Sequence, residues 1–85
     1  MQTGEPVYYE LIDFIARGTT PDSVIAFRPS ALAEARVSDL IERERQGTVS
    51  AADKSELDRY MTLEHILRMA KIRAREILAN EQEST

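Results

Sequence analysis

The sequence contains no cysteine, no tryptophan, a single histidine, and only three residues each of glycine and proline. Without cysteine, neither disulfides nor thiolate metal sites can stabilise the chain of 85 residues. A chain this short buries a limited share of its surface, so dimerisation is the remaining common way to gain buried apolar area. The longest apolar runs fall far short of the ~20 residues that a membrane-spanning helix needs.

The charge composition of the chain limits its possible functions further. Charged residues make up 31% and hydrophobic residues 42% of the chain, which is an ordinary balance for a folded domain. The net charge of −4 argues against non-specific nucleic-acid binding by the domain as a whole. Residues 1–5 have neither the basic segment nor the apolar core of a secretory signal. We therefore expect one domain over 1–85, in the cytoplasm and without membrane contact.

Glycine and proline divide the first half of the chain into two short helices. Pro6 suits a first helical turn, and apolar residues then recur at helical spacing until Gly18, which predicts a helix over 6–17. Thr20 is a suitable N-cap for a second helix. That helix ends near Ala26, because a proline shortly after it disfavours the α conformation.

The second half of the chain predicts two longer helices. Ser30 begins one of them, and Gly47 ends it about 16 residues later. Ser50 caps the next helix, and the absence of glycine and proline beyond it lets the helical pattern run to about Ala79, or ~43 Å. We expect an all-α fold in which these two helices form a long antiparallel hairpin, with residues 1–5 and 80–85 as frayed tails.

The apolar residues of the last helix cover a wider arc than one neighbouring helix would bury. They are Leu57, Tyr60, Met61, Leu63, Ile66, Leu67, Ala70, Ala74, Ile77 and Leu78. The preceding helix can cover the first half of this arc. The second half can be covered by the two N-terminal helices, by a second copy of the chain, or by another protein. The architecture we expect is a homodimer formed through the last helix.

The sequence offers no pattern typical of a catalytic or cofactor site. His65 has no metal-ligand residue three or four positions away on its helix. There is no Gly-x-Ser-x-Gly nucleophile motif, and three glycines do not make a phosphate-binding loop. We therefore expect no catalytic, metal or cofactor-binding residues and no enzymatic activity.

A basic stripe on the last helix is the first candidate for a binding surface. Arg68, Lys71 and Arg75 lie at positions i, i+3 and i+7, which places them on one side of the helix. The stripe can meet an acidic protein surface or phosphates, or it can be an ordinary solvated face. Glu64 precedes Arg68 by four residues, which predicts an ion pair between them.

Two aromatic residues of the first helix are the second candidate. Tyr9 and Phe14 point away from the apolar stripe of that helix, so they can contact a partner or pack under the second helix. The candidate partner-binding residues are therefore Tyr9, Phe14, Arg68, Lys71 and Arg75.

Three segments carry a resemblance to known proteins: LIDFIARGTTP at 11–21, RVSDLIERERQG at 36–47, and the helix from Ser50 to Arg75. Together they cover about residues 8–75 and resemble a group of small uncharacterised bacterial helical proteins. Some members are encoded beside toxin-like genes, including HNH-type nucleases, and look antitoxin-like. The resemblance implies a cytoplasmic helical partner protein and assigns no role to an individual residue.

The function we expect is a non-enzymatic protein-binding module, antitoxin-like, that acts by occluding a partner protein. Two other classes stay open. One is a small dimeric nucleic-acid-binding protein, which would need two copies of the basic stripe on one face. The other is a structural or assembly protein that uses the apolar arc of the last helix to join a complex.

Overall fold

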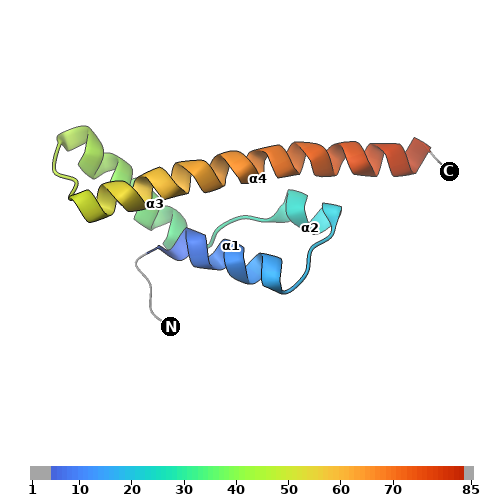
Figure 1. Ribbon diagram of the computed structural model, residues 1–85, viewed down its shortest axis with the longest axis horizontal. Helices are drawn as coiled ribbons and strands as arrows, with labels where there is room; N and C mark the ends of the chain where they lie inside the picture. Colours follow the sequence, from blue (N-terminus) through green and yellow to red (C-terminus); the bar gives the residue numbers. More distant parts are fainter. Residues whose placement is uncertain (1–4, 84–85) are drawn as a thin grey trace.

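The computed structural model describes residues 5–83 and, over this range, contains helices and no strand. The helices are α1 (Pro6–Ala16), α2 (Pro21–Ala26), α3 (Ala31–Gln46) and α4 (Ala51–Glu83) (Figure 1). The molecule is elongated, with extents of 54 × 28 × 18 Å, because α4 runs along its whole length (Figure 1). The all-α prediction is confirmed. No helix in the described part of the chain is long and apolar enough to cross a membrane.

Side-chain caps begin the helices where we predicted them. The Thr20 hydroxyl accepts a hydrogen bond from the Ser23 N–H at 3.1 Å, and the Ser23 hydroxyl accepts one from the Thr20 N–H at 2.8 Å. These reciprocal bonds satisfy donors that the helix itself leaves without a partner. Ser30 caps α3 with a single bond of this kind, in which its hydroxyl accepts from the Ala33 N–H at 3.1 Å. Gly47 ends α3 with a φ of +77°, a conformation that other residues rarely adopt.

The last helix begins as predicted and ends later than predicted. The Ser50 hydroxyl accepts from the Asp53 N–H at 3.0 Å, which caps α4. The helix continues to Glu83, although we expected a polar tail from residue 80. Glutamate and glutamine are good helix formers, so a polar segment without glycine or proline does not by itself end a helix. Residues 1–4 and 84–85, also predicted as frayed, lie outside the described range.

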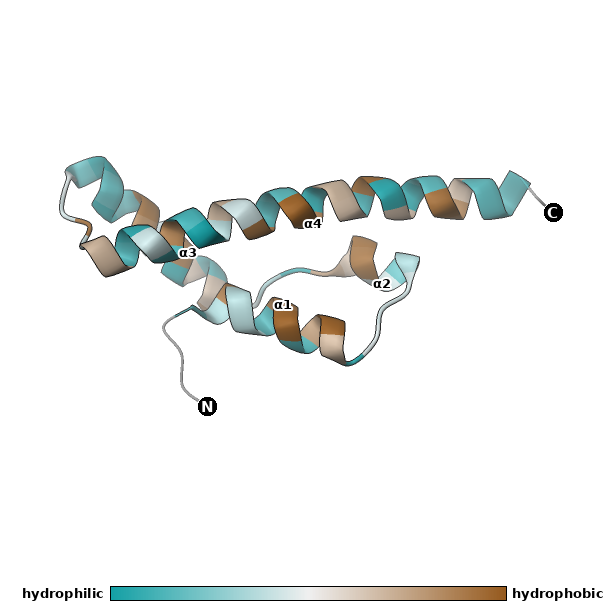
Figure 2. Ribbon diagram, viewed as in Figure 1, coloured by the Kyte–Doolittle hydropathy of each residue, from teal (hydrophilic) through white to brown (hydrophobic). Residues whose placement is uncertain are grey.

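The core lies where α1, α3 and the first half of α4 meet. Its buried apolar members are Val7, Leu11, Ala33, Val37, Leu40 and Leu57. Ala74 is also buried, but it lies in the second half of α4 next to residues of α2. Figure 2 shows hydrophobic residues concentrated in α1, α2 and the middle of α4, and hydrophilic residues in the last turns of α4. Because α2 packs on the C-terminal half of α4, one side of that half is covered by the chain itself.

An ion-pair network joins α3 to the start of α4. The Arg36 guanidinium donates to both carboxylate oxygens of Glu56 at 2.9 and 3.2 Å, and to Asp53 at 3.1 Å. Arg43 donates to Asp53 at 2.9 Å and pairs with Asp39 at 3.0 Å. We call these five residues the α3–α4 network. It explains how the Glu56 side chain can be buried, since both of its carboxylate oxygens accept hydrogen bonds.

Two further contacts fix α1 against the α2–α3 segment. Glu10 accepts from the backbone N–H of Ser30 at 2.7 Å and from its hydroxyl at 2.6 Å. The ring of Phe14 packs against that of Phe27, with centroids 4.6 Å apart. The end of α2 and the beginning of α3 are therefore held in place by side chains from α1.

Candidate functional site

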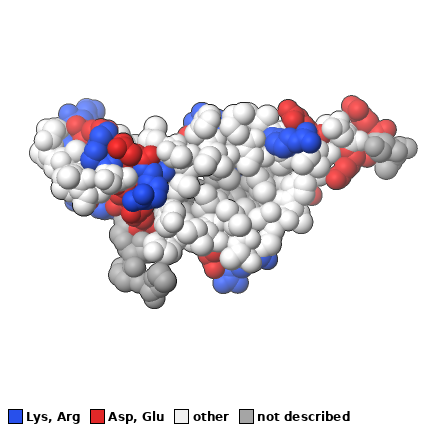
Figure 3. All heavy atoms as spheres, in the orientation of Figure 1, with Lys and Arg blue, Asp and Glu red and all other residues white. Residues whose placement is uncertain are grey.

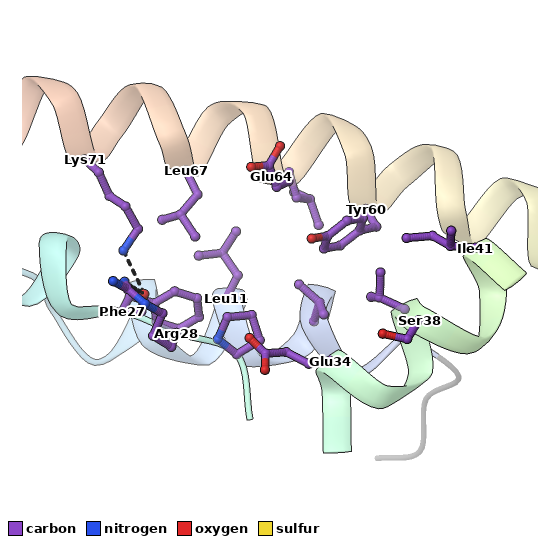
Figure 4. Close-up of a pocket in the computed structure, with 14 residues that line it drawn as sticks. Leu11, Phe27, Arg28, Glu34, Ser38, Ile41, Tyr60, Glu64, Leu67 and Lys71 are labelled. Atoms are coloured by element: carbon purple, nitrogen blue, oxygen red, sulfur yellow. Dashed lines mark hydrogen bonds between the residues drawn. The ribbon is translucent and has the colours of Figure 1, made fainter. Parts of the chain in front are cut away.

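A groove lies between α4 on one side and α1, α3 and the α2–α3 linker on the other (Figure 4). Its volume is about 510 Å³, and it opens to solvent. Its apolar floor consists of Val7, Leu11, Val37, Tyr60, Leu63 and Leu67. The other lining residues are Phe27, Arg28, Pro29, Glu34, Ser38, Ile41, Glu64 and Lys71. A hollow with an apolar floor and a few polar groups is typical of a binding site.

Tyr60 contributes a hydroxyl group to the groove lining. Its ring packs against the core, and its hydroxyl points into the hollow (Figure 4). Burial raises the pKa of Tyr60 above its ordinary value, and the nearby charges of Glu64 and Glu34 raise it further. The phenol therefore stays protonated at neutral pH and is available as a hydrogen-bond donor.

Lys71 lies at the opposite end of the groove and connects α4 to α2. Its ammonium donates to the carbonyl oxygens of Ile25 and Phe27, each at 2.7 Å, which are acceptors at the C-terminal end of α2 (Figure 4). Arg28 donates to the same two oxygens, at 3.1 Å and 2.7 Å. Burial lowers the pKa of Lys71, and the neighbouring charges of Arg28 and Arg75 lower it further. Two cations therefore converge on one pair of carbonyl groups.

The predicted basic stripe is divided between different surroundings. Arg68 donates to Glu64 at 2.7 and 3.2 Å, which confirms the predicted ion pair. Lys71 turns toward α2 and lines the groove. Arg75 is exposed and forms no hydrogen bond or ion pair with another residue in the range 5–83. The three side chains of this stripe thus lie in three different environments.

The two predicted aromatic residues lie outside the groove lining. Tyr9 is 37% exposed and meets the Tyr8 ring edge-on, with centroids 5.3 Å apart. Phe14 packs on Phe27, which corresponds to the alternative in which this residue lies under the second helix. Of the five candidate partner-binding residues, only Lys71 lines the groove.

Sequence reasoning missed four polar residues of the groove: Arg28, Glu34, Ser38 and Tyr60. In the sequence, Arg28 stands out only as the residue before Pro29, the proline that ends the second helix, and Tyr60 only as part of the apolar arc. Lys71 reaches the carbonyl of Phe27 across 44 residues of sequence. Helical periodicity describes neighbours on one helix and carries no information about contacts between helices.

A second apolar surface follows α4 outside the groove. Met61, Ile66, Met69 and Ile72 are between 43% and 56% exposed. Successive helical residues are rotated by about 100°, so Met61, Met69 and Ile72 point away from the side that carries Leu67 and Ala74. Figure 3 shows that, on the face in view, charged side chains lie at the two ends and along the upper and lower edges of the molecule, around an uncharged middle.

Within residues 5–83, no three histidine, cysteine, aspartate or glutamate side chains lie close enough together to hold a metal ion. His65 is exposed on α4. Comparison of the chain with protein-family models, curated proteins and solved structures yields no match. Any assignment of function therefore depends on the geometry of the groove and of the surfaces around it.

Proposed function

We propose that this chain is a non-enzymatic protein-binding module that binds an amphipathic helix of a partner protein in its groove. The observation that carries the proposal is the open groove of about 510 Å³ with an apolar floor. A helix that presents apolar residues at positions i, i+3, i+4 and i+7 is a common occupant of such grooves. Its apolar side would cover Leu11, Leu63 and Leu67, and its polar side would stay in water.

The charges along the groove favour one orientation of that helix. Lys71 and Arg28 lie at the end next to α2, and Tyr60 lies further along near Glu34 and Glu64 (Figure 4). The C-terminal end of a helix carries partial negative charge and the N-terminal end partial positive charge. We therefore infer that the C-terminal end of the bound helix lies near Lys71 and its N-terminal end near Glu34.

The mechanism we propose is occlusion. A bound helix could not take part in the partner's own function while its apolar side is buried in the groove. This agrees with the antitoxin-like role that the sequence resemblance implies. In this proposal α3 and the first part of α4 act as an antiparallel hairpin, which the α3–α4 network keeps rigid.

The test is selection of helical peptides of about four turns, or ~14 residues, from a displayed library against the purified chain. Binding of the enriched peptides is then measured on two variants of α3. Ile41→Asp places a charge in the groove, where residue 41 is 48% exposed. Leu32→Asp makes the same kind of change outside the groove lining, where residue 32 is 78% exposed.

We expect peptides with the i, i+3, i+4, i+7 apolar pattern to bind the Leu32→Asp variant normally and the Ile41→Asp variant at least tenfold more weakly. Circular dichroism shows whether both variants keep their helical content. Failure to enrich any peptide, or equal binding to both folded variants, would refute the groove as a recognition site.

The exposed stripe on α4 supports homodimerisation as a second proposal. Met61, Met69 and Ile72 are large apolar residues on a side that α1, α2 and α3 leave uncovered. A second copy of α4 offers the same stripe, so the two can bury each other around a two-fold axis. Light scattering after size-exclusion chromatography is expected to show a dimer for the native chain and a monomer for Met69→Glu. A monomeric native chain at high concentration would rule out this assembly.

A further inference from the structure

The cations that lack an acidic partner are not scattered over this protein. The chain has 11 lysine and arginine residues against 15 acidic ones, and all 11 lie within residues 5–83. Ion pairs with a carboxylate are found for Arg17, Arg36, Arg43, Arg45, Lys54, Arg59, Arg68 and Arg73. No such pair within this range is found for Arg28, Lys71 or Arg75. In a protein with net charge −4, Arg28 and Lys71 line one end of the groove, and the charges of Arg28 and Arg75 both act on Lys71.

The three side chains keep unused hydrogen-bond donors. An ammonium has three N–H donors, and Lys71 uses two of them on Ile25 and Phe27. Arg28 uses only Nη1 in its bonds to these carbonyls, so Nε and Nη2 are available. Arg75 lies four residues after Lys71 and is therefore its neighbour on the surface of α4. Lys71 from α4 and Arg28 from the α2–α3 linker thus converge on the same carbonyl groups, and Arg75 lies one helical turn from Lys71.

Their proximity is unfavourable as long as no anion is present. The positive charges of Arg28 and Arg75 both repel that of Lys71, and Lys71 is also partly buried. The two carbonyl groups compensate in part, since each accepts from both Lys71 and Arg28. A negatively charged group placed between these cations would relieve the repulsion and form charge-assisted hydrogen bonds.

We propose that Arg28, Lys71 and Arg75 form an anion subsite that binds a carboxylate of the partner helix held in the groove. This inference rests on the proposed function and names the chemistry of the partner. The carboxylate belongs to a glutamate or aspartate in the last turn of the helix, or to its C-terminus, because Arg28 and Lys71 line the end of the groove that receives that turn.

The surroundings of the subsite favour a peptide carboxylate over the phosphates of a nucleic acid. Leu67 and Leu11 line the groove together with Lys71, and an apolar floor suits the side chains of a helix. Nucleic-acid backbones are bound by several cations along an extended path. Here the remaining lysine and arginine side chains are already paired with carboxylates.

The experiment uses the full chain and the peptides enriched from the displayed library. We expect most of them to carry an acidic residue in the last turn, and replacement of that residue by its amide to weaken binding about tenfold. Arg75→Gln is the first variant to test, because Arg75 takes part in no hydrogen bond or ion pair within residues 5–83 and its loss should not affect folding. This variant should bind the acidic peptide about threefold to tenfold more weakly and bind the amide peptide as tightly as the native chain does.

Arg73→Gln is the matched control, since it removes an arginine of the same helix that pairs with Glu76. It should bind both peptides as the native chain does. A second readout is the NMR titration of the Lys71 ammonium, whose pKa should rise when the acidic peptide binds and stay unchanged with the amide peptide.

Enriched peptides that lack acidic residues, or that bind the Arg75→Gln variant equally well, would overturn the subsite and leave the proposed function in place. Failure to enrich any peptide would refute both. A single-stranded DNA oligonucleotide serves as a further probe. If it bound more tightly than the peptides and lost its affinity in the Arg75→Gln variant, the anion would be a phosphate and the carboxylate assignment would be wrong.

Discussion

Glu10 is a single residue that holds two segments of the fold together. Its carboxylate accepts both the backbone N–H and the hydroxyl of Ser30, the residue that caps α3. Replacement of Glu10 by glutamine should lower the free energy of unfolding by about 1 kcal/mol, because the neutral amide offers one acceptor where the carboxylate offers two. Urea denaturation monitored by circular dichroism measures this change. Glu81→Gln, an exposed change near the end of α4, is the control and should change it far less.

A second residue-scale effect depends on pH. The hydrogen bond from Arg59 lowers the pKa of Glu5 below its ordinary value of 4.5. A carboxyl group whose pKa is lowered by folding stabilises the folded state above its unfolded pKa, and this stabilisation is lost as the pH falls through the folded pKa. Glu5→Gln should therefore be less stable than the native chain at about pH 7, and the difference should shrink as the pH falls below 4.5. Urea denaturation over a range of pH measures it. A difference that grows on acidification would contradict this assignment.

At the residue scale, the sequence predicted local contacts and missed distant ones. The Glu64–Arg68 pair and the caps by Thr20 and Ser50 follow from spacings of three or four residues, which helical geometry converts directly into contacts. The bonds from Ser30 to Glu10 span 20 residues, and their existence depends on how α1 and α3 cross. No periodic pattern contains that information.

At the scale of a helix, two leucines of α3 show the difference between core and surface. Leu40 is 0% exposed, whereas Leu32 is 78% exposed. Leu40→Ala should lower the free energy of unfolding by about 2–4 kcal/mol, because it removes buried methyl groups and leaves a cavity. Leu32→Ala should change it by less than about 0.5 kcal/mol. Chemical denaturation of both variants tests the comparison, and similar losses for the two would mean that α3 is oriented differently.

The helix boundaries were predicted most accurately, except for the C-terminal end of α4. Glycine, proline and capping residues mark the boundaries of α1, α2 and α3, because each acts on the local backbone. The sequence after Ala79 contains no glycine or proline, and Asn80, a residue type that can end a helix, lies inside α4. We interpreted its polarity as a tail, but polarity governs which surface a helix exposes and not whether the backbone stays helical.

At the scale of the whole molecule, the residues of the α3–α4 network should contribute to the free energy of unfolding together and not independently. Arg36→Met should lower the free energy of unfolding by about 2 kcal/mol or more, because the buried carboxylate of Glu56 would lose hydrogen bonds. Adding Glu56→Leu should restore much of the loss, since an apolar pair avoids the desolvation of two charges. A double-mutant cycle from urea denaturation gives the coupling energy. Strictly additive effects would show that the two residues do not act together.

The overall arrangement was predictable only in part. The wide apolar arc of α4 correctly indicated that α3 alone could not cover this helix. The structure shows that α2 covers one side of the second half, while Met61, Ile66, Met69 and Ile72 stay exposed. The sequence could not select this arrangement, because a helix of six residues has too few apolar side chains to show where it packs. The sequence did not predict the groove either, because the groove exists only once α1 and the α2–α3 linker have been placed against α4.

The shortness of α2 also has a kinetic consequence. Six residues cannot keep an isolated helix stable in water, so α2 depends on its contacts with α4. Its bonds with Lys71 close loops of 44 and 46 residues, whereas α3 and α4 meet across a loop of a few residues. Because long loops close at a greater entropic cost, we expect α2 to dock after α3 and α4 have formed and to detach first. Amide hydrogen exchange should then be faster in Val24 and Ile25 than in Val37 and Leu40, and the groove would open and close with α2 while the rest of the protein stays folded.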